Sequence, residues 1–337
     1  MDALGIGGVM RRLLPDRLAP RSEADAVMQR LWGTVALETA EELSRHLSRE
    51  GIAHAVFKGA ALLENVYEPG DIDLSDVDVL VDSARADEAV RELIEQGFTP
   101  PDDDAISMPG DPESVLRRPV PEGAELLAVD VDLHGLMWPA RRLLPWKGSP
   151  LPAAVWAGVE QPGRFPVFRP GHHGAMLVHH LVRHDFLHFR SMADLVMLWD
   201  RLRDSSEAAA MAELSRSLEV GWAAHAVTAA LARDLSLPPI PLSSTRGTRR
   251  ELARPAVSVT WAAALALDAT ARDFEAITLT RALRRLVAVD SLSAAGSVLR
   301  DAFVPPDAFL VWRWPGVSPV ARRLRHLRRI IGLVRDA

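Results

Sequence analysis

The sequence predicts an α+β fold, a mixed sheet with helices, that is followed by a largely helical second half. Two segments in the first half alternate apolar and polar residues with the period of two that is typical of strands. A stretch rich in proline and glycine comes next, and beyond it the apolar residues recur with helical spacing. We therefore expect an N-terminal helical segment (1–50), an α+β domain (51–140), a linker (141–171) and a helical domain (172–337).

The first predicted element is an amphipathic helix over residues 22–50, which Gly51 ends. The apolar run IAHAVF that follows predicts a short strand, and it stops abruptly at Lys58 and Gly59. The residues AALLENVY then have the composition of a short helix, which Pro69 terminates. The chain therefore turns from strand to helix at a lysine–glycine pair.

The two alternating segments carry acidic residues in step. LSDVDVLV (74–81) puts Asp76 and Asp78 on one face, and LLAVDVDLHGLM (126–137) does the same for Asp132 and His134. The other predicted elements are a helix over 83–96, a loop over 99–123, helices over 172–203, 207–235, 248–268 and 276–300, and a basic helix over 319–335.

Composition excludes several classes of protein. The 337 residues include no cysteine, so a disulfide scaffold, a thiol nucleophile and a cysteine-based metal site are all excluded. Neither an apolar run long enough to cross a bilayer nor a signal-peptide pattern is found, and we expect a cytoplasmic protein. Of the 39 basic residues all but Lys58 and Lys147 are arginine, so each lysine is unusual in this chain.

Charge is distributed unevenly along the chain, whose net charge is −6. Residues 64–113 hold 16 acidic and two basic side chains, a surface on which we expect no long nucleic acid. The last helix is basic, and its apolar residues follow one stripe. Such a helix can pack on its own domain, or bind an anionic membrane or an acidic peptide. The stripe consists of Val320, Leu324, Leu327, Ile331 and Val334.

The aspartates on the two alternating segments are candidate metal ligands. Carboxylates two residues apart on one strand project to the same side, and Asp76 and Asp78 could hold Mg²⁺ or Mn²⁺ there. Asp132 on a neighbouring strand could join them, and two metal ions so held can activate an attacking oxygen and stabilise a leaving pyrophosphate. The alternative is a solvated sheet edge with acidic side chains.

Two further groups of residues have both a functional and a structural interpretation. Lys58 and Gly59 open a helix, where amide N–H groups and an ammonium group suit a phosphate, although a surface lysine at a turn is equally compatible. His180, His184 and His188 are four residues apart, so on one helix they form a stripe. They are candidate metal ligands, or they line the interface with the α+β domain and its cleft.

The motifs together resemble a known family. The run FKGAALLENVYEPGDIDLSDVDVLVD, then VDLHGLMW, HHLVRHDFLHFRSMADLVMLWD and FVPPDAFLVWRWPG, is similar to the uncharacterised bacterial nucleotidyltransferase family of the DNA polymerase β-like superfamily. The resemblance covers most of residues 25–335 and implies a small polymerase β-like domain with a C-terminal helical domain. One departure is that family members often carry an arginine before the S-D-x-D motif, where this chain has Asp71-Ile72-Asp73.

The resemblance also implies residue roles and an activity. Asp76, Asp78 and Asp132 would be the catalytic, metal-binding carboxylates. The enzyme would transfer a nucleoside monophosphate from an NTP to an unknown small-molecule, peptide or protein acceptor. A role in tailoring modified peptides or natural products is one that the resemblance implies. The alternatives are a non-catalytic nucleotide- or peptide-binding module and a toxin-like tRNA nucleotidyltransferase. The implied nucleotide contacts are Lys58, Gly59, Ser75, His134, His180, Arg183 and His184.

Overall fold

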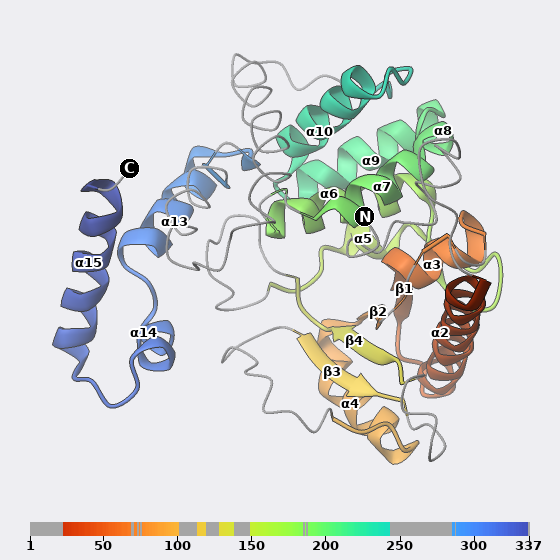
Figure 1. Ribbon diagram of the computed structural model, residues 1–337, viewed down its shortest axis with the longest axis horizontal. Coiled ribbons are helices and arrows are strands. Elements are labelled where there is room, and N and C mark those ends of the chain that lie inside the picture. Colours follow the sequence, from red (N-terminus) through yellow and green to blue (C-terminus); the bar gives the residue numbers. More distant parts are fainter. Residues whose placement is uncertain are drawn as a thin grey trace.

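A computed structural model of the chain describes most of its length (Figure 1). The described residues are 23–68, 71–72, 74, 76–100, 113–118, 128–137, 149–184, 186, 188–242, 285–286 and 288–335. The predicted helix over 248–268, the start of the one over 276–300, Ser75 and Lys147 lie outside them.

A mixed six-stranded sheet forms the centre of the first half, with the strand order β3-β4-β2-β1-β6-β5. β2 pairs in parallel with β4, and β1 pairs in parallel with β6, whereas the other pairings are antiparallel. The predicted α+β class is therefore confirmed. The strands are β1 (His54–Phe57), β2 (Asp76–Val81), β3 (Glu113–Arg117), β4 (Asp130–His134), β5 (Val159–Glu160) and β6 (Val167–Phe168).

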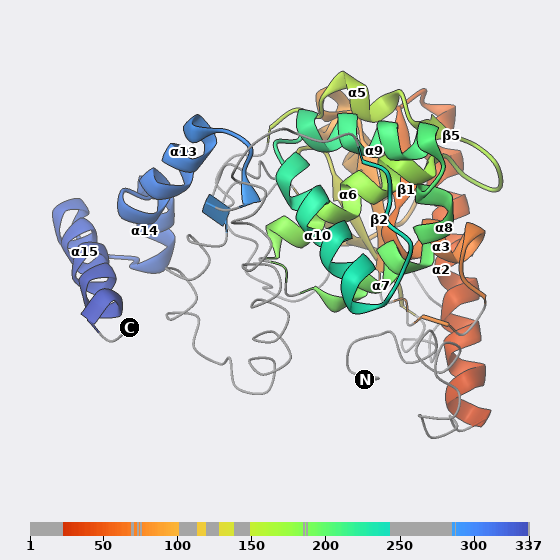
Figure 2. The same ribbon diagram turned by 90° about the horizontal axis from the view of Figure 1, so that it is seen from above.

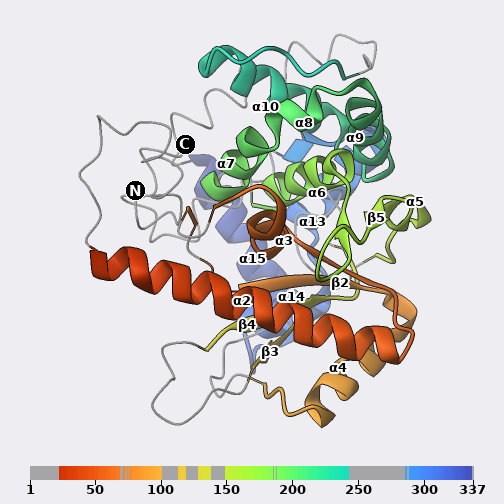
Figure 3. The same ribbon diagram turned by 90° about the vertical axis from the view of Figure 1, so that its right-hand side faces the viewer.

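Three helices of the first half cover the sheet. The long helix α2 (Glu23–Arg49) runs along it and contacts β1, β2, α3 and α4 (Figure 3). α3 (Lys58–Asn65) begins directly where β1 ends, as the lysine–glycine pair predicts. After β2, a single 3₁₀ turn, η3 (Ser83–Arg85), leads into α4 (Ala86–Glu95). In the described part of the predicted strand over 126–137, Asp130–His134 form β4, and Met137 makes an isolated bridge to Ser149.

The segment predicted as a linker contributes to the sheet in its described part. β5 and β6 lie within it, and Val167 of β6 pairs with Val56 of β1. A short helix, α5 (Ala153–Trp156), precedes them. One hydrophobic core then continues from α2 through the sheet into α6, α9 and α10, so the two halves pack as one unit here.

The helical half consists of shorter helices than the sequence predicts. The predicted helix over 172–203 is wrong: the chain leaves the helix at His184, and Phe186 has a positive φ of 63°. The predicted helix over 207–235 likewise breaks near Glu219, whose φ is 60°. The helices are α6 (Pro170–Arg183), α7 (Phe189–Met197), α8 (Trp199–Leu202), α9 (Ser205–Ser217), α10 (Gly221–Asp234), α13 (Leu292–Phe303), α14 (Asp307–Arg313) and α15 (Pro319–Arg335).

The last three helices stand away from the sheet (Figure 2). Phe309 and Leu310 form a small apolar cluster of their own with Trp314, separate from the main core. No helix in the described ranges has both the length and the apolar character that a membrane span requires.

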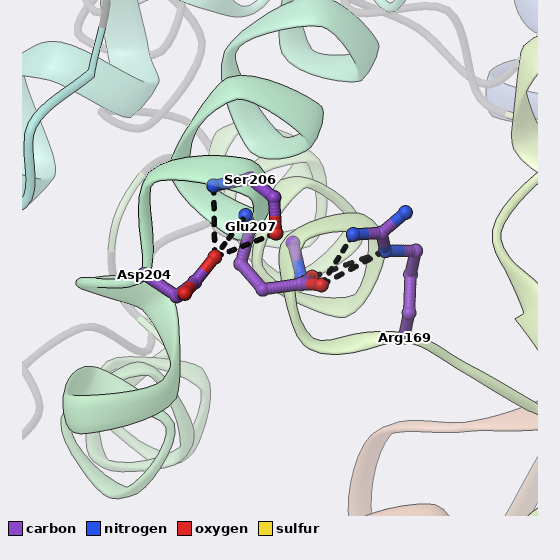
Figure 4. A network of polar contacts seen from close by, with 5 residues as sticks. Arg169, Asp204, Ser206 and Glu207 are labelled. Carbon is purple, nitrogen blue, oxygen red and sulfur yellow. Dashed lines mark hydrogen bonds and ion pairs between the residues drawn. The ribbon is translucent and has the colours of Figure 1, made fainter.

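A polar network fixes α6 against α9 (Figure 4). Glu207, in the first turn of α9, accepts hydrogen bonds from Arg169 Nε at 3.0 Å and from the Gly171 backbone N–H at 2.7 Å. Asp204 caps the same helix by accepting from Ser206 N at 2.8 Å. Burial alone would raise the pKa of Glu207, but these hydrogen bonds outweigh it and lower the pKa. The N-termini of α6 and α9 are thereby held together.

Replacing Glu207 by alanine should therefore destabilise the protein. Arg169 and the Gly171 N–H lose their acceptor, and hydrogen bonds to charged groups of this kind contribute about 1–3 kcal/mol each. We expect the free energy of unfolding in urea to fall by about this amount. Glu213→Ala, at an exposed position of the same helix, is the matched control and should change it by less than about 0.5 kcal/mol. Equal effects in both variants would contradict the assignment.

Candidate functional site

A pocket of about 290 Å³ opens between the sheet and the helices α3, α6 and α7. One wall carries carboxylates from the sheet, and the other carries histidines and arginines from the helices. The lining residues are Lys58, Gly59, Asp76, Asp78, Asp132, His180, Arg183, His184, His188, Arg190, Ser191 and Asp194. Eight of the ten residues predicted as site residues line this pocket.

The strand register brings the carboxylates together. Asp78 of β2 is paired with Asp132 of β4, and because the strands are parallel and in register both side chains project from the same face. Ligand atoms of Asp78, Asp132 and His134 all lie within 4.8 Å of one another, the only such group among the described residues. Asp76, two residues before Asp78 on β2, also lines the pocket. The two strands thus supply the donor set that a divalent cation requires.

Two neighbouring side chains stabilise the charge of Asp78. Lys58 Nζ lies 2.5 Å from its Oδ1 and His134 Nε2 lies 3.0 Å from the same atom, with all three side chains largely buried. Burial alone would raise the pKa of Asp78, but the Lys58 ammonium and the His134 hydrogen bond lower it to about 2. Asp78 is therefore ionised at every physiological pH.

Lys58 holds its position through the backbone. Phe57 pairs with Asp78 across β1 and β2, so the next residue reaches the same carboxylate. Lys58 adopts a φ of 55°, which is uncommon for a residue with a side chain and occurs where surrounding structure enforces it. Its N–H donates to His173 Nε2 at 3.1 Å, which requires an unprotonated Nε2, and burial lowers the pKa of His173 to about 4.

Gly59 allows the helical wall to approach the turn closely. A Cβ atom at this position would lie 2.5 Å from Arg190 Nη2 and closer still to Leu74 Cδ2. A side chain there would therefore displace the guanidinium of Arg190 from the pocket wall. The glycine of the lysine–glycine pair thus leaves room for Arg190 and Leu74 at the turn, whatever the pocket binds.

The three histidines meet across a helix break, not on one helix. His184 is the C-cap of α6 and His188 is the N-cap of α7, so the predicted single-helix stripe is wrong. Their rings nevertheless pack together, with centroid distances of 4.3 Å from His180 to His184 and 4.6 Å from His180 to His188. Their nitrogens do not form a convergent group like that at Asp78, which disfavours the metal-ligand interpretation.

Two of the three clustered histidines, His180 and His188, are largely uncharged. Burial, followed by the nearby Lys58 charge, lowers the pKa of His180 well below its usual value. The same two causes, with Arg190, lower the pKa of His188 to about 4. The Nδ1 of His188 accepts from the Ser191 backbone N–H at 3.3 Å, which fits a neutral ring. These rings therefore offer hydrogen bonds and flat surfaces to a ligand, not positive charge.

The arginine side chains of the pocket come from the helices α6 and α7. Asp71, where the resembling family often has an arginine, is buried and accepts from the Glu68 N–H at 3.0 Å. Arg183 and Arg190 line the pocket instead. The sequence motifs predict Arg183 as a site residue but not Arg190. The only signal for Arg190 in the sequence is its position within the motif HHLVRHDFLHFRSMADLVMLWD.

Asp194 is a second residue that sequence reasoning did not assign to the site. It lies on α7, lines the pocket and accepts a hydrogen bond from Tyr67, the only tyrosine, at 2.5 Å. Burial raises the pKa of Asp194 to about 6, against the opposing effects of Arg190 and Tyr67. Asp130, in contrast, pairs with Arg117 at 2.7 Å and does not line the pocket.

The raised pKa of Asp194 predicts a pH effect on stability. The folded state holds the proton up to about pH 6 and the unfolded state only to about pH 4, so stability falls as pH rises between these values. Relative to Asp194→Asn, the free energy of unfolding of the wild type should fall by about 3 kcal/mol from pH 4 to pH 7. Urea titrations measure it, with exposed Asp200→Asn as control. Parallel profiles for wild type and Asp194→Asn would contradict the assignment.

Sequence comparison assigns the family. Residues 10–235 match the profile of a family described as uncharacterised nucleotidyltransferases, which is 226 of the 337 residues. The matched part includes every residue that lines the pocket. No curated protein and no solved structure matches the chain. The resemblance carried by the lysine–glycine turn and the paired aspartates is thereby confirmed, and the chain belongs to the uncharacterised nucleotidyltransferase family.

Proposed function

We propose that the protein is a Mg²⁺- or Mn²⁺-dependent enzyme that transfers a nucleoside monophosphate from an NTP to an acceptor and releases pyrophosphate. The observation that carries this proposal is the in-register pair Asp78 and Asp132, which lies beside Lys58 and lines one pocket together with Arg183 and Arg190. A metal–nucleotide complex presents cations and a chain of phosphates, and this pocket offers a complementary partner for each.

The carboxylates are the proposed metal ligands. Oxygen donors from Asp76, Asp78 and Asp132 suit Mg²⁺ and Mn²⁺, and a buried carboxylate with a pKa of about 2 needs no deprotonation before it can bind a cation. His134 donates to Asp78 and orients it, as residues next to metal ligands commonly do. A metal ion bound here would neutralise phosphate charge and help to activate the attacking oxygen.

The cations and histidines are the proposed nucleotide contacts. Lys58, at the start of α3, and the two arginines would hold the phosphates, while Gly59 permits their close approach. His180 and His184, together with Arg183, would contact the nucleotide or the acceptor through their rings and N–H groups. Ser75, which precedes β2 in the sequence, is also a nucleotide contact in this proposal.

The transfer step needs only positioned charges and one proton acceptor. The acceptor oxygen attacks the α-phosphorus, the bond from this phosphorus to the bridging oxygen breaks, and pyrophosphate leaves with the electron pair. In this proposal Asp132 takes the proton of the acceptor hydroxyl or, as a metal ligand, orients the attacking group. Catalysis then comes from alignment and charge neutralisation, without a covalent enzyme intermediate.

The acceptor class is proposed on charge grounds. The excess of acidic residues in the sequence between 64 and 113 disfavours a long nucleic acid, so a small molecule, a peptide or a protein with a free hydroxyl fits better. Peptide tailoring in the cytoplasm is the specific role we propose. Mass spectrometry of a lysate incubated with the protein and NTPs would identify the acceptor by its added mass.

Removing either central carboxylate should abolish transfer. Asp78→Asn and Asp132→Asn should each lower the labelling of acceptors from α-labelled NTPs by about a thousandfold, because the charge that opposes the phosphates is lost. Mn²⁺ binding, followed by electron paramagnetic resonance, should weaken in parallel. Asp130→Asn, two residues away on the same strand, is the matched control and should retain activity. Wild type that binds NTP without labelling any acceptor would indicate a non-catalytic binding module.

Weakening the cationic wall should affect nucleotide binding more than turnover. Arg190→Ala should raise the KM for NTP about tenfold to a hundredfold, since a charge-assisted contact to phosphate is lost. Gly59→Ala should act in the same direction by displacing Arg190. Exposed Arg203→Ala is the control. An unchanged KM in Arg190→Ala, measured by pyrophosphate release, would remove this arginine from the phosphate site.

A further inference from the structure

The C-terminal helices carry most of the exposed apolar side chains of the described chain. Fourteen large apolar side chains are exposed among the described residues, and eight of them lie between residues 292 and 327. This part of the chain contributes few residues to the main core. The eight are Leu292, Leu299, Phe303, Val304, Val311, Val320, Leu324 and Leu327. Monomeric proteins rarely gather apolar surface in this way without a binding partner.

Helix α15 packs on its neighbours through one side and exposes its apolar stripe on another. His326 is only 3 % exposed, and its Nε2 lies 2.8 Å from the Ala302 carbonyl oxygen of α13. The side chains of Val320, Leu324 and Leu327, four and three residues apart, are 70 %, 52 % and 43 % exposed. Figures 1 and 2 both show α15 as the outermost element at its end of the molecule. These three residues of the stripe therefore face solvent.

Positive charge borders this stripe on both sides. The segment 319–335 contains six arginines and no acidic residue. At 100° per residue, Arg323 falls on one side of the stripe and Arg328 on the other, and both are exposed. Arg323 pairs with Asp307 of the adjacent helix α14 at 2.8 Å.

We propose that α15 binds an anionic lipid surface, with its apolar stripe in the interface and its arginines at the headgroups. A straight apolar stripe on a convex helix, flanked by cations, fits a flat surface that is apolar inside and negative outside. A second copy of the chain fits poorly, because two such faces would bring arginines against arginines. This inference is independent of the nucleotidyltransferase activity.

Vesicle flotation of the full-length protein tests the proposal. We expect association with vesicles of equimolar phosphatidylglycerol and phosphatidylcholine to be at least about tenfold tighter than with phosphatidylcholine alone, and to weaken as salt is added. Leu324→Gln combined with Leu327→Gln should reduce it about tenfold through loss of the apolar contact. Arg325→Gln combined with Arg328→Gln should reduce it similarly and remove most of the salt dependence.

Controls separate lipid binding from misfolding and from other partners. Ile94→Gln, an exposed apolar residue of α4, should bind vesicles like the wild type, and circular dichroism should show that all variants remain folded. Absence of preference for anionic vesicles overturns the proposal. So does vesicle binding that survives the two leucine changes, or a tight complex with an acidic peptide or RNA in the absence of any vesicle binding.

Discussion

The ionised carboxylate of Asp78 is the constraint on which the rest of the site depends. Burial disfavours its charge, and the charge persists because Lys58 and His134 compensate it within 3.0 Å. Removing one member of a buried pair leaves the other uncompensated, which costs more than the pair contributes. The strained backbone of Lys58, its hydrogen bond to His173 and the pairing of Phe57 with Asp78 all keep the ammonium group where that compensation is possible.

The pocket separates its charges by structural origin. Negative groups come from adjacent strands, whose spacing and direction are fixed by backbone pairing, while the arginines come from helices. His180 and His188 between them remain largely uncharged, because both are buried near the charge of Lys58. A bound metal–nucleotide would therefore meet rigidly placed carboxylates on one side and longer, more adaptable cationic side chains on the other.

Local patterns in the sequence predicted the fold class, the strand-to-helix turn at Lys58 and the shared face of Asp76 and Asp78, because each depends on spacing within a few residues. The parallel register of β2 and β4 has no local signal, so the pairing of Asp78 with Asp132 became visible only in three dimensions. Helix breaks at His184 and Glu219 were missed because the apolar pattern continues through them. Asp194 and Tyr67, 127 residues apart, are joined by tertiary packing alone.

The break between α6 and α7 has a consequence for how this wall tolerates changes in chain length. A residue inserted within α6 would rotate every later position of that helix by about 100° and would remove His180 from the pocket. An insertion between His184 and His188 would leave the rotation of both helices unaltered, since α6 ends at Arg183 and α7 begins at Phe189. The positions of the clustered histidines in the pocket can thus differ between sequences while the helices, the arginines and the sheet remain in place.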